Sequence, residues 1–597
     1  MAHDTLAGMF WSRIEQTPDR PAHQFKQGGE WRTLTWREVG ERVREAALGL
    51  LTLGRQRGDR VALLSTSRPE WVHADFAIFS AGCATIPIYP TYPPDLVAYV
   101  VNDSGAKTLI VEDPAQLAKA LEARAKMADL EQIVVLGGYE GSESGDLLTW
   151  ATLRRRGREE AEPLTRALAE RIASVGRDDI ATIVYTSGTT GPPKGVVQTH
   201  GNHVAAVAAS TAATPVQSEW VDLLFLPLAH SFGRLESFLG VAHGVTTAFA
   251  ENIDRVGDNL RETHPHFLFS VPRVFEKVYA RILAGVEAGS PAKRRIFRWA
   301  IGVGREVSRL QQAGQPVPTA LALKRALAHK LVFAKLHAAL GGRLQWAVSG
   351  GAPLSRDIAE FFHAAGILIL EGYGLTETCP IGTFNRPTRY KFGSVGQALP
   401  GVEVAIAADG EILLRGANVA TRGYYKQPEA TAEVFQADGW FHTGDIGHLD
   451  EDGFLFITDR KKDLIVTAGG MNIAPQNIEN MLKADPFISQ AMVYGDRRPF
   501  PVALITLNPD ELTKFAREAG ILATDPGVVA RHPRVVERVG RTVEEKNGRL
   551  QSYARIKKFT VLPADFTQDG GELTPTLKLK RKVVAEKYRA ELDELYR

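Results

Sequence analysis

Residues 60–138 alternate between short apolar runs and longer segments with a helical pattern. The apolar runs are VALLS, ATIPIY, KTLIVED and QIVVLGG, and between them lie PEWVHADFAIFSAG, PPDLVAYVVNDSG and PAQLAKALEARAKM. Pro69 and Pro94 stand where two of the helices would begin, and the first helical turn tolerates the missing N–H of proline. This alternation of strands and helices predicts a mostly parallel sheet with helices on both faces.

The rest of the chain predicts further units. A length of 597 residues exceeds what one hydrophobic core usually supports. Strand-like runs between Gly and Asp turns follow Gly393 and predict a β-rich subdomain, whereas the runs after Lys462 predict a small α+β unit. We therefore expect an α/β fold. Its large N-terminal domain, residues 1–459, would combine mostly parallel α/β sheets with the β-rich subdomain, and residues 460–597 would form a small, mobile α+β domain. The polar segment 141–176 is expected to be a surface connection or a small helix.

Composition excludes several classes of protein. The 71 Lys and Arg residues nearly balance the 69 Asp and Glu residues, so the net charge of +2 argues against a nucleic-acid partner. Cys83 and Cys379 supply neither a disulfide framework nor a metal cluster, which fits a reducing cytoplasm. The N-terminus lacks the pattern of a secretion signal, and no apolar stretch is long enough to cross a bilayer. We expect a cytoplasmic protein.

The segment IATIVYTSGTTGPPKGVVQTH, residues 180–200, places a loop rich in glycine and hydroxyl groups between two apolar runs. Its candidate phosphate-binding residues are Thr186, Ser187, Gly188, Thr189, Thr190, Gly191 and Lys194. A polyphosphate needs many donors and a fixed cation, which this loop offers. The loop is not of the Walker type, because a Walker lysine is followed by Ser or Thr and a helix. From the loop alone, a glycine-rich surface hairpin without a ligand is an alternative.

Two later apolar runs also end in glycine-rich turns. The first turn contains Gly350, Gly351 and Ala352, and the second contains Glu371, Gly372, Tyr373, Thr376 and Glu377. Ligands of open α/β sheets bind at the carboxyl ends of the strands, so both turns are expected to face one cleft. Tyr373 offers a flat face to adenine, Thr376 a hydroxyl group to phosphate, and Glu377 a carboxylate to Mg²⁺.

The strings YTSGTTGPPKG, EGYGLTET, HTGD and ITDR together resemble the adenylate-forming enzymes, the family of acyl-CoA synthetases, luciferases and peptide-synthetase adenylation domains. The resemblance implies that Asp445 and Arg460 hold the ribose, that Lys462 is a hinge and that Lys578 is the catalytic lysine. In most of the family this lysine follows Ser-Gly, whereas here Thr576 and Leu577 precede it, as in the long-chain fatty acyl branch. VPRVFEKVY also resembles that branch.

The resemblance implies an AMP-forming ligase that uses ATP, Mg²⁺ and CoA. The catalytic residues would be Lys578, Thr376, Glu377 and His230, with Mg²⁺ near Thr186 and Glu377. His230 is expected at the end of the strand in VDLLFLPLAH and would line the acyl pocket, although a lone histidine is also often a core residue. Asp445 and Lys462 also have a purely structural interpretation. Asp445 could simply form a turn, and Lys462 could simply belong to a charged turn.

A fatty acid is the expected substrate. Amino-acid-activating relatives carry an acidic residue after the strand that precedes His230, where it holds the amine of the substrate. This chain has HSFGRLE there, with Arg234 before Glu236, which disfavours an amino acid. Apolar residues that could surround a chain are Phe225, Leu226, Phe232, Phe267, Phe269 and Val271, which could equally be core. The chain ends soon after Lys578, so we expect a diffusible acceptor, most simply CoA. An acyl-AMP ligase that feeds a separate carrier protein, and a silent lipid-binding paralogue, are the alternatives.

A basic segment suggests a second kind of contact. Lys293, Arg294, Arg295 and Arg298 alternate with Ile296, Phe297 and Trp299. This pattern suits a peripheral contact with the inner face of a membrane. It also suits an amphipathic helix that packs on the protein core.

Overall fold

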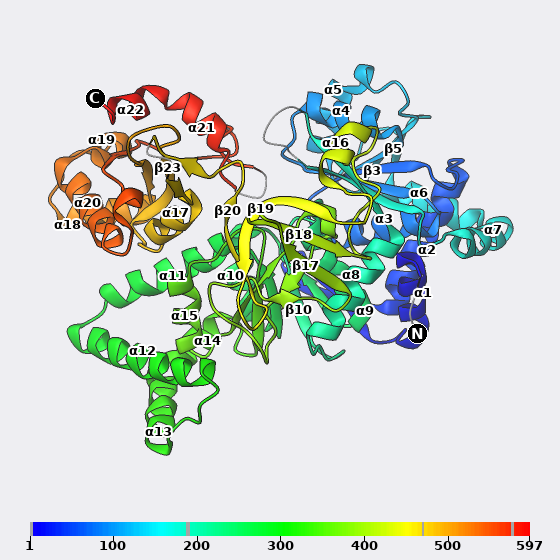
Figure 1. Ribbon diagram of the computed structural model, residues 1–597. Helices are drawn as coiled ribbons and strands as arrows, with labels where there is room; N and C mark the ends of the chain where they lie inside the picture. The colour runs from blue at the N-terminus through cyan, green and yellow to red at the C-terminus, as the bar shows by residue number, and fades with distance from the viewer. Residues whose placement is uncertain (1–3, 187–191, 469–470, 575–577) are drawn as a thin grey trace.

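The computed structural model of the protein describes residues 4–186, 192–468, 471–574 and 578–597. Two large sheets with their helices form the N-terminal body, and a four-stranded sheet lies against it. A three-stranded sheet with its own helices forms a smaller C-terminal unit, orange to red in Figure 1. The predicted α/β fold class, with a large N-terminal and a small C-terminal part, is confirmed.

The first sheet contains seven strands in the order β7-β6-β5-β3-β4-β8-β9. Its strands are β3 (Arg60–Leu64), β4 (Ala84–Ile88), β5 (Ala106–Val111), β6 (Gln132–Val135), β7 (Leu147–Thr149), β8 (Ile180–Thr186) and β9 (Lys194–Thr199). Neighbouring strands are parallel except for β8 and β9. The crossover helices are α3 (Pro69–Ser80), α4 (Pro94–Ser104) and α5 (Pro114–Glu122), each with proline in its first turn. The predicted alternation is confirmed.

The second sheet contains nine strands in the order β16-β15-β14-β13-β12-β10-β11-β1-β2. They are β1 (Pro21–Gln27), β2 (Glu30–Thr35), β10 (Val221–Leu224), β11 (Thr246–Phe249), β12 (Phe267–Ser270), β13 (Trp346–Ser349), β14 (Ile369–Tyr373), β15 (Thr383–Phe384) and β16 (Gln397–Ala398). Because β10, β12, β13 and β14 are parallel neighbours, their carboxyl ends lie at one edge of the sheet. The two predicted turns follow β13 and β14 at this edge.

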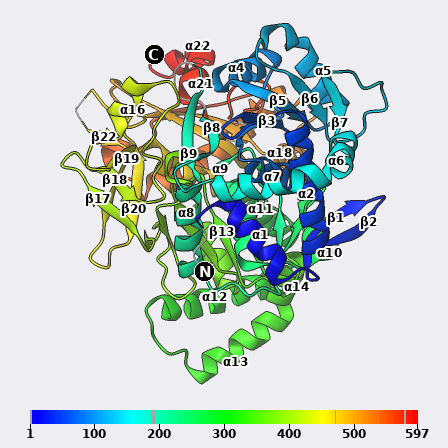
Figure 2. The ribbon, with the colours of Figure 1, turned by 90° about the vertical axis from the view of Figure 1, so that its right-hand side faces the viewer.

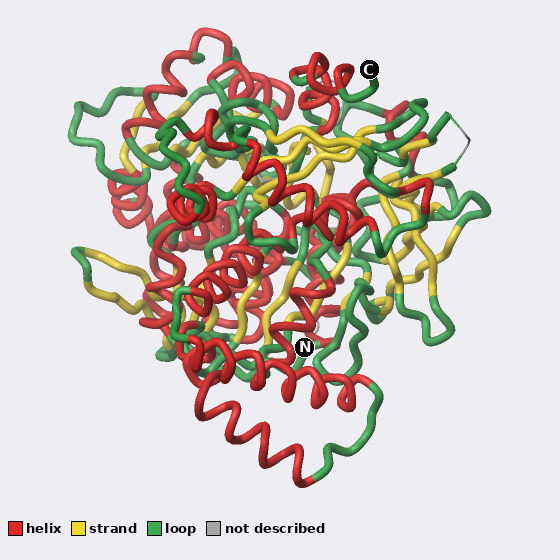
Figure 3. The backbone as a smooth tube through the Cα atoms, turned by 90° about the vertical axis from the view of Figure 1, so that its left-hand side faces the viewer, coloured by secondary structure: helices red, strands yellow, loops and turns green. Residues whose placement is uncertain are grey.

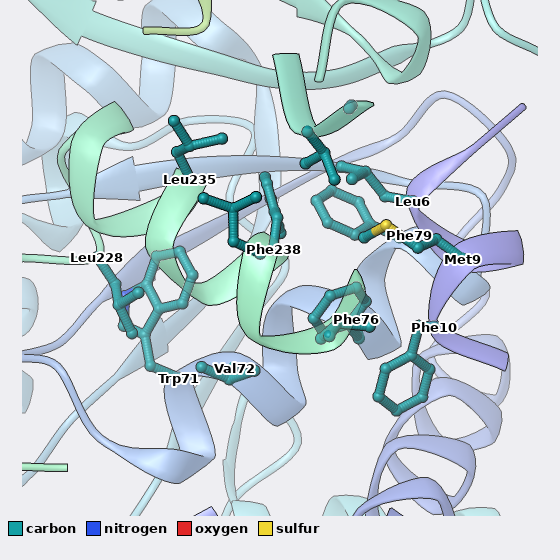
Figure 4. Packing of buried hydrophobic residues seen from close by; sticks show 14 of the residues in the cluster. Leu6, Met9, Phe10, Trp71, Val72, Phe76, Phe79, Leu228, Leu235 and Phe238 are labelled. Carbon is teal, nitrogen blue, oxygen red and sulfur yellow. The ribbon is translucent and has the colours of Figure 1, made fainter. Parts of the chain in front are cut away.

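The largest core joins the two sheets through a layer of helices. These helices are α1 (Leu6–Gln16), α2 (Trp36–Thr52), α3, α8 (His200–Ala213) and α9 (Ser231–His243). In β3, Val61 and Leu63 belong to this core, whereas Ala62 and Leu64 pack on the opposite side beneath α4 and α5. Strand residues alternate between the two faces, and both faces of this strand are buried, which explains its continuous apolar run. Figure 4 shows the packed aromatic side chains of the layer.

The segment 141–176 is more ordered than predicted. It forms β7, α6 (Trp150–Glu159) and α7 (Ala161–Ser174), and α6 packs against α2. Trp150 and Leu153 are buried although their neighbours are charged. A Cβ atom at Gly157 would lie 2.0 Å from the carbonyl oxygen of Glu45, so the glycine lets the two helices approach closely. The prediction of a small helix at the surface is confirmed, but the segment forms two helices, and two apolar positions and one glycine dock the first of them on α2.

The four-stranded antiparallel sheet confirms the predicted β-rich subdomain. It consists of β17 (Val402–Ile406), β18 (Glu411–Gly416), β19 (Phe441–Leu449) and β20 (Leu455–Arg460), with α16 (Pro428–Val434) beside β19. The C-terminal unit contains β21 (Ile465–Val466), β22 (Asn472–Ile473), α17 (Pro475–Lys483), β23 (Ile488–Tyr494), β24 (Val502–Leu507), α18 (Pro509–Glu518), α19 (Pro526–Ala530), α20 (Pro533–Asn547), β25 (Lys558–Val561), α21 (Arg581–Lys587) and α22 (Arg589–Glu594). Its mixture of helices and strands matches the predicted α+β unit.

Helices cover the outer face of the second sheet. They are α10 (Val256–Thr263), α11 (Pro272–Glu287), α12 (Pro291–Gln312), α13 (Thr319–Ala328), a π-helical turn (His329–Phe333), α14 (Ala334–Ala339) and α15 (Arg356–Ala364). We call residues 291–339 the helical arm. Figures 1 to 3 show that α13 forms an outer edge of the molecule. In the described part of the chain, no helix has the length and apolar composition needed to cross a membrane.

Candidate active site

One cavity of about 2090 Å³ collects the described candidate residues from distant parts of the chain. Its lining includes Thr186, Lys194, His230, Gly350, Gly351, Ala352, Glu371, Gly372, Tyr373, Thr376, Glu377, Asp445, Arg460, Lys462 and Lys578. The cavity lies where the carboxyl ends of β13 and β14 meet the four-stranded sheet and the C-terminal unit. Ser187, Gly188, Thr189, Thr190 and Gly191 lie outside the described residues.

The ends of the predicted phosphate loop are held together by an antiparallel pair of strands. Thr186, the last residue of β8, is paired with Lys194, the first residue of β9. The Lys194 ammonium lies 4.9 Å from the centre of the Tyr424 ring, a cation–π contact that holds the charge at the cavity wall. The prediction of a loop between two strands is confirmed.

The turn after β13 is packed too closely for a larger residue. A Cβ atom on Gly350 would lie 2.9 Å from the Phe232 ring. Glu371 of β14 supports the same turn, because its carboxylate accepts a hydrogen bond of 3.1 Å from the backbone N–H of Leu354. Burial raises the pKa of Glu371 to about 7. Glu371 therefore anchors the turn that carries Gly351 and Ala352.

Three side chains form a network on one side of the cavity. The Tyr373 hydroxyl donates a hydrogen bond of 2.6 Å to Asp445 Oδ2, and Arg460 Nε lies 3.4 Å from Asp445 Oδ1. Asp445 and Arg460 face each other across the β19–β20 pair. Burial raises the pKa of Asp445, whereas the charge of Arg460 opposes this shift. The network fixes a carboxylate in a position where it can accept hydrogen bonds from a ligand.

Thr376 and Glu377 lie in a short 3₁₀ turn after β14, Thr376–Thr378. Gln198 donates a hydrogen bond of 2.6 Å to the Thr376 carbonyl oxygen, and the Tyr424 hydroxyl donates one of 2.8 Å to Glu377 Oε1. Burial raises the pKa of Glu377. The sequence analysis missed Gln198 and Tyr424, which connect this turn to β9 and to Lys194. Tyr424 stands in the string RGYYKQP, where the pair of tyrosines was the only local sign of a functional residue.

Glu377 could bind a hard cation only if a bound ligand supplied further oxygen atoms to it. No cluster of three or more His, Cys, Asp or Glu side chains suited to a metal occurs among residues 4–186, 192–468, 471–574 and 578–597. Mg²⁺ is usually held by one or two carboxylates together with substrate phosphates and water. A single carboxylate in a cavity that the hydroxyl-bearing Thr186 also lines therefore fits a Mg²⁺ ion that arrives with a nucleotide.

His230 was predicted at the end of a strand, and this position was wrong, because His230 caps the start of helix α9. β10 ends at Leu224, and His230 Nδ1 accepts a hydrogen bond of 3.1 Å from the N–H of Phe232 at the start of α9. Burial, and then the charge of Lys578, lowers the pKa of His230 to about 3. His230 is therefore a neutral side chain that lines the cavity.

Lys578 brings a cation from the C-terminal unit into the same cavity. Burial and the charge of Arg460 lower its pKa to about 8, whereas Asp445 and Glu377 act in the opposite direction. Thr576 and Leu577, which precede it, lie outside the described residues. The C-terminal unit that carries Lys578 is docked on α11, where Arg273 donates hydrogen bonds to the carbonyl oxygen (2.9 Å) and Oγ (2.6 Å) of Ser489.

Apolar side chains form part of the cavity lining. They are Phe232, Leu235, Leu239, Phe269, Val271 and Val348. Phe232, Phe269 and Val271 were predicted. Leu226 and Phe267 instead pack in the main core, and Phe225 packs against it, so these three do not line the cavity.

The sequence analysis took Arg234 as a sign against an amino-acid substrate, but its side chain has a structural role. It is fully buried, and both carboxylate oxygens of Asp75 in α3 accept hydrogen bonds from it at 2.7 and 2.8 Å. Its guanidinium also donates to Thr182 Oγ1 at 2.6 Å. Arg234 therefore joins α9 to the first sheet, and it carries no information about the substrate. Glu236 is also fully buried, and burial raises its pKa.

Comparison with known proteins identifies the family. Residues 10–425 match the model of the AMP-binding enzyme family, and residues 462–597 match that of the AMP-binding enzyme C-terminal domain. The long-chain-fatty-acid–CoA ligase FadD15 of Mycobacterium bovis is 40% identical over 604 residues, which span 100% of this chain and 97% of that protein. The human long-chain-fatty-acid–CoA ligase ACSBG1 is 32% identical, covering 99% of this chain and 85% of its own length.

The fold is likewise shared. The crystal structure of the anthranilate CoA ligase AuaEII in complex with anthranoyl-AMP has a TM-score of 0.74 at 20% identity and covers 99% of each chain. From these matches and from the cavity that two distant parts of the chain enclose, we conclude that this chain belongs to the AMP-binding enzyme family.

Proposed function

We propose that the protein is an AMP-forming long-chain fatty acid–CoA ligase. The observation that carries the proposal is the position of Lys578, which reaches the cavity that holds Glu377 and Asp445 although it lies in the C-terminal unit. The 40% identity with a long-chain-fatty-acid–CoA ligase over the full chain supports the same function. The apolar part of the cavity, which includes Leu235, Leu239 and Phe269, suits an alkyl chain.

The first step converts a poor acyl donor into a good one. A carboxylate oxygen of the fatty acid attacks the α-phosphorus of ATP, the bond to the β-phosphate oxygen breaks, and pyrophosphate leaves. Negative charge develops at the α-phosphate, so fixed cations are the expected catalysts. We assign this role to Lys578, and we assign Lys194 to the departing pyrophosphate. A Mg²⁺ ion held by Glu377, with Thr186 nearby, supplies further charge neutralisation when bound.

The nucleoside is assigned to the other side of the cavity. Tyr373 presents its ring to adenine, and Asp445, held by Tyr373 and Arg460, accepts hydrogen bonds from the ribose hydroxyls. Gly350, Gly351 and Ala352 border the space between these groups and the apolar part. His230, neutral at physiological pH, is placed to line the path of the acyl carboxylate.

In the second step the sulfur of CoA attacks the acyl carbonyl carbon, the bond between that carbon and the phosphate oxygen breaks, and AMP leaves. Lys578 and a thiol cannot approach the same centre together, so the C-terminal unit has to move. We propose that it turns about Lys462, just after the proposed domain boundary between residues 459 and 460. Such hinge motions let one site perform two steps.

The test is pyrophosphate release from ATP with a panel of fatty acids, with and without CoA. The proposal predicts release that depends on a long-chain fatty acid and continuous turnover only with CoA. Turnover that ignores CoA but responds to an acyl carrier protein would identify an acyl-AMP ligase. Absence of release with every acid, while a fatty acid still binds, would identify a silent lipid-binding protein.

A further inference from the structure

The helical arm concentrates positive charge in a nearly neutral protein. Residues 291–339 contain ten Lys or Arg residues and one acidic residue, Glu306, which gives a formal charge of +9. The whole chain has a formal charge of +2, so the remainder carries −7. The arm is therefore a basic projection on an acidic body, and it attracts anionic surfaces.

The arm also carries a continuous apolar stripe. Leu323 and Leu327 of α13 and Leu331 of the adjoining π-helical turn are 69%, 50% and 46% exposed. The four-residue spacing places the two α13 leucines on one helical face, and Leu331 follows them after a further four residues. We call these three residues the leucine stripe. The buried positions of α13, Leu321 and Ala328, pack into the core of the outer helices. Because α13 already uses its inner positions for folding, the leucine stripe belongs to an outward face.

No other exposed apolar group in the described residues has this arrangement. The arm holds five of the fourteen large hydrophobic side chains that are exposed, and the remaining nine are scattered singly or in short loops. Single exposed apolar residues are normal, whereas a contiguous stripe marks an interaction surface. α13 lies at an outer edge of the molecule, so the stripe can meet a flat partner (Figures 2 and 3).

Basic side chains flank the stripe. Lys324 and Lys330 are both exposed. At the start of α12, Arg294, Arg295 and Arg298 line a recess of about 320 Å³. Lysine stems can lie along apolar surface while their charged ends reach anionic head groups.

From the sequence, residues 293–299 could be either a membrane contact or an amphipathic helix that packs on the core. The structure shows which residues pack on the core. Phe297 packs toward Phe361 of α15, with 6.3 Å between ring centres, so one face of α12 does belong to the core. Ile296 and Trp299 are exposed. Lys293, Arg295 and Arg298 are likewise exposed, so α12 is a core helix with a basic outer side.

We infer that the α13 stripe and its flanking lysines dock the protein on the surface of an anionic lipid bilayer. Leucines on one face of a helix, with basic residues beside them, are the pattern of a helix that lies in the membrane interface. A dimer that joins two arms fits less well, because two arms of charge +9 would repel each other. A nucleic acid would use the charge but would leave the leucines exposed to water.

The docked arm also connects to the candidate active site. α11 immediately precedes the arm, and Pro272, Arg273 and Glu276 of α11 line the cavity. α11 therefore links the cavity, which its first turn borders, to the arm that follows its last turn. The inference does not depend on the proposed ligase activity, because vesicle binding is measured without substrate.

The test is co-sedimentation of the full-length protein with two kinds of vesicle, phosphatidylcholine alone and phosphatidylcholine with phosphatidylglycerol. We expect binding to the anionic vesicles that weakens as salt is added. The variant L323Q/L327Q/L331Q should reduce this binding at least tenfold. The single variant Leu522→Gln, at a residue that is 94% exposed elsewhere, should bind as the wild type does.

A second pair of variants tests the charge without changing the apolar stripe. Lys324→Gln with Lys330→Gln should weaken binding to anionic vesicles several-fold, whereas Lys557→Gln with Lys558→Gln, which removes the same charge from an exposed site in the C-terminal unit, should not. Equal binding by the arm variants and their controls would overturn the inference. So would loss of self-association or of DNA binding, instead of vesicle binding, in the leucine variant. Unchanged thermal unfolding establishes that the variants are folded.

Discussion

Replacement of Lys578 by alanine removes the cation that we assign to the α-phosphate. The side chain lies in a cavity with Glu377 and Asp445, and its pKa of about 8 leaves it mostly protonated at neutral pH. The variant therefore deletes a charge from the site without creating a large cavity in the core. The deletion should affect only the step in which charge develops at phosphorus.

The size of the effect follows from the electrostatics of a partly buried site. Two unit charges about 4 Å apart interact by about 4 kcal/mol at an effective dielectric constant of about 20. Loss of one fixed donor at a developing oxyanion typically costs about 10²–10³ in rate, which is about 3–4 kcal/mol. We expect Lys578→Ala to slow adenylate formation by a factor in this range. Lys558→Ala, at an exposed lysine in the same C-terminal unit, should retain the wild-type rate.

Two assays separate the half-reactions. Adenylate formation is followed as pyrophosphate release in a single turnover, and acyl transfer is followed as thioester formation from supplied acyl adenylate and CoA. The account predicts a loss in the first assay and near wild-type rates in the second. An equal loss in both assays would refute the role assigned to Lys578, because it would indicate damage to the whole site.

Further predictions concern pH, the hinge, the docking of the C-terminal unit and the buried ion pair. Because protonated Lys578 is the active form and its pKa is lowered to about 8, kcat/KM for ATP should fall as pH rises through about 8, and Lys578→Arg should abolish this fall. Lys462→Pro should spare pyrophosphate release and block thioester formation; unchanged overall turnover would contradict the hinge. Arg273→Ala removes two hydrogen bonds that dock the C-terminal unit and should slow adenylation about tenfold while thioester formation from acyl adenylate is retained, whereas equal slowing of both steps would argue against this role. Asp75→Ala leaves the side chain of Arg234 buried without its partner and should lower the free energy of unfolding, measured by denaturation with guanidinium chloride, by about 3–5 kcal/mol. The double variant Asp75→Leu/Arg234→Met should recover most of this loss, and additive losses would contradict the pairing.

Local patterns predicted most of the fold because the strands of the first sheet are buried on both faces. Each such strand is a continuous apolar run, as in VALLS, and each crossover helix begins at a proline. The site turns were also predictable, since ligands gather where parallel strands end. Tyr373 and Glu377 could be located from their position after β14 alone.

Contacts between distant residues could not be predicted in the same way. Arg234 and Asp75 are 159 positions apart, so the sequence did not reveal that the arginine forms a buried ion pair and says nothing about the substrate. Tyr424 is 47 positions from Glu377, and its role as hydrogen-bond donor to that carboxylate has no local signature. The leucine stripe of α13 was overlooked because exposure depends on which face of the helix the core occupies.

We propose that the protein forms an acyl adenylate in this cavity before any thiol takes part. The most direct test is exchange of radioactive pyrophosphate into ATP, measured with a long-chain fatty acid and Mg²⁺ but without CoA. The account predicts exchange that requires the fatty acid and falls about 10²–10³-fold in Lys578→Ala. Formation of ADP, or exchange that is absent until CoA is added, would contradict it.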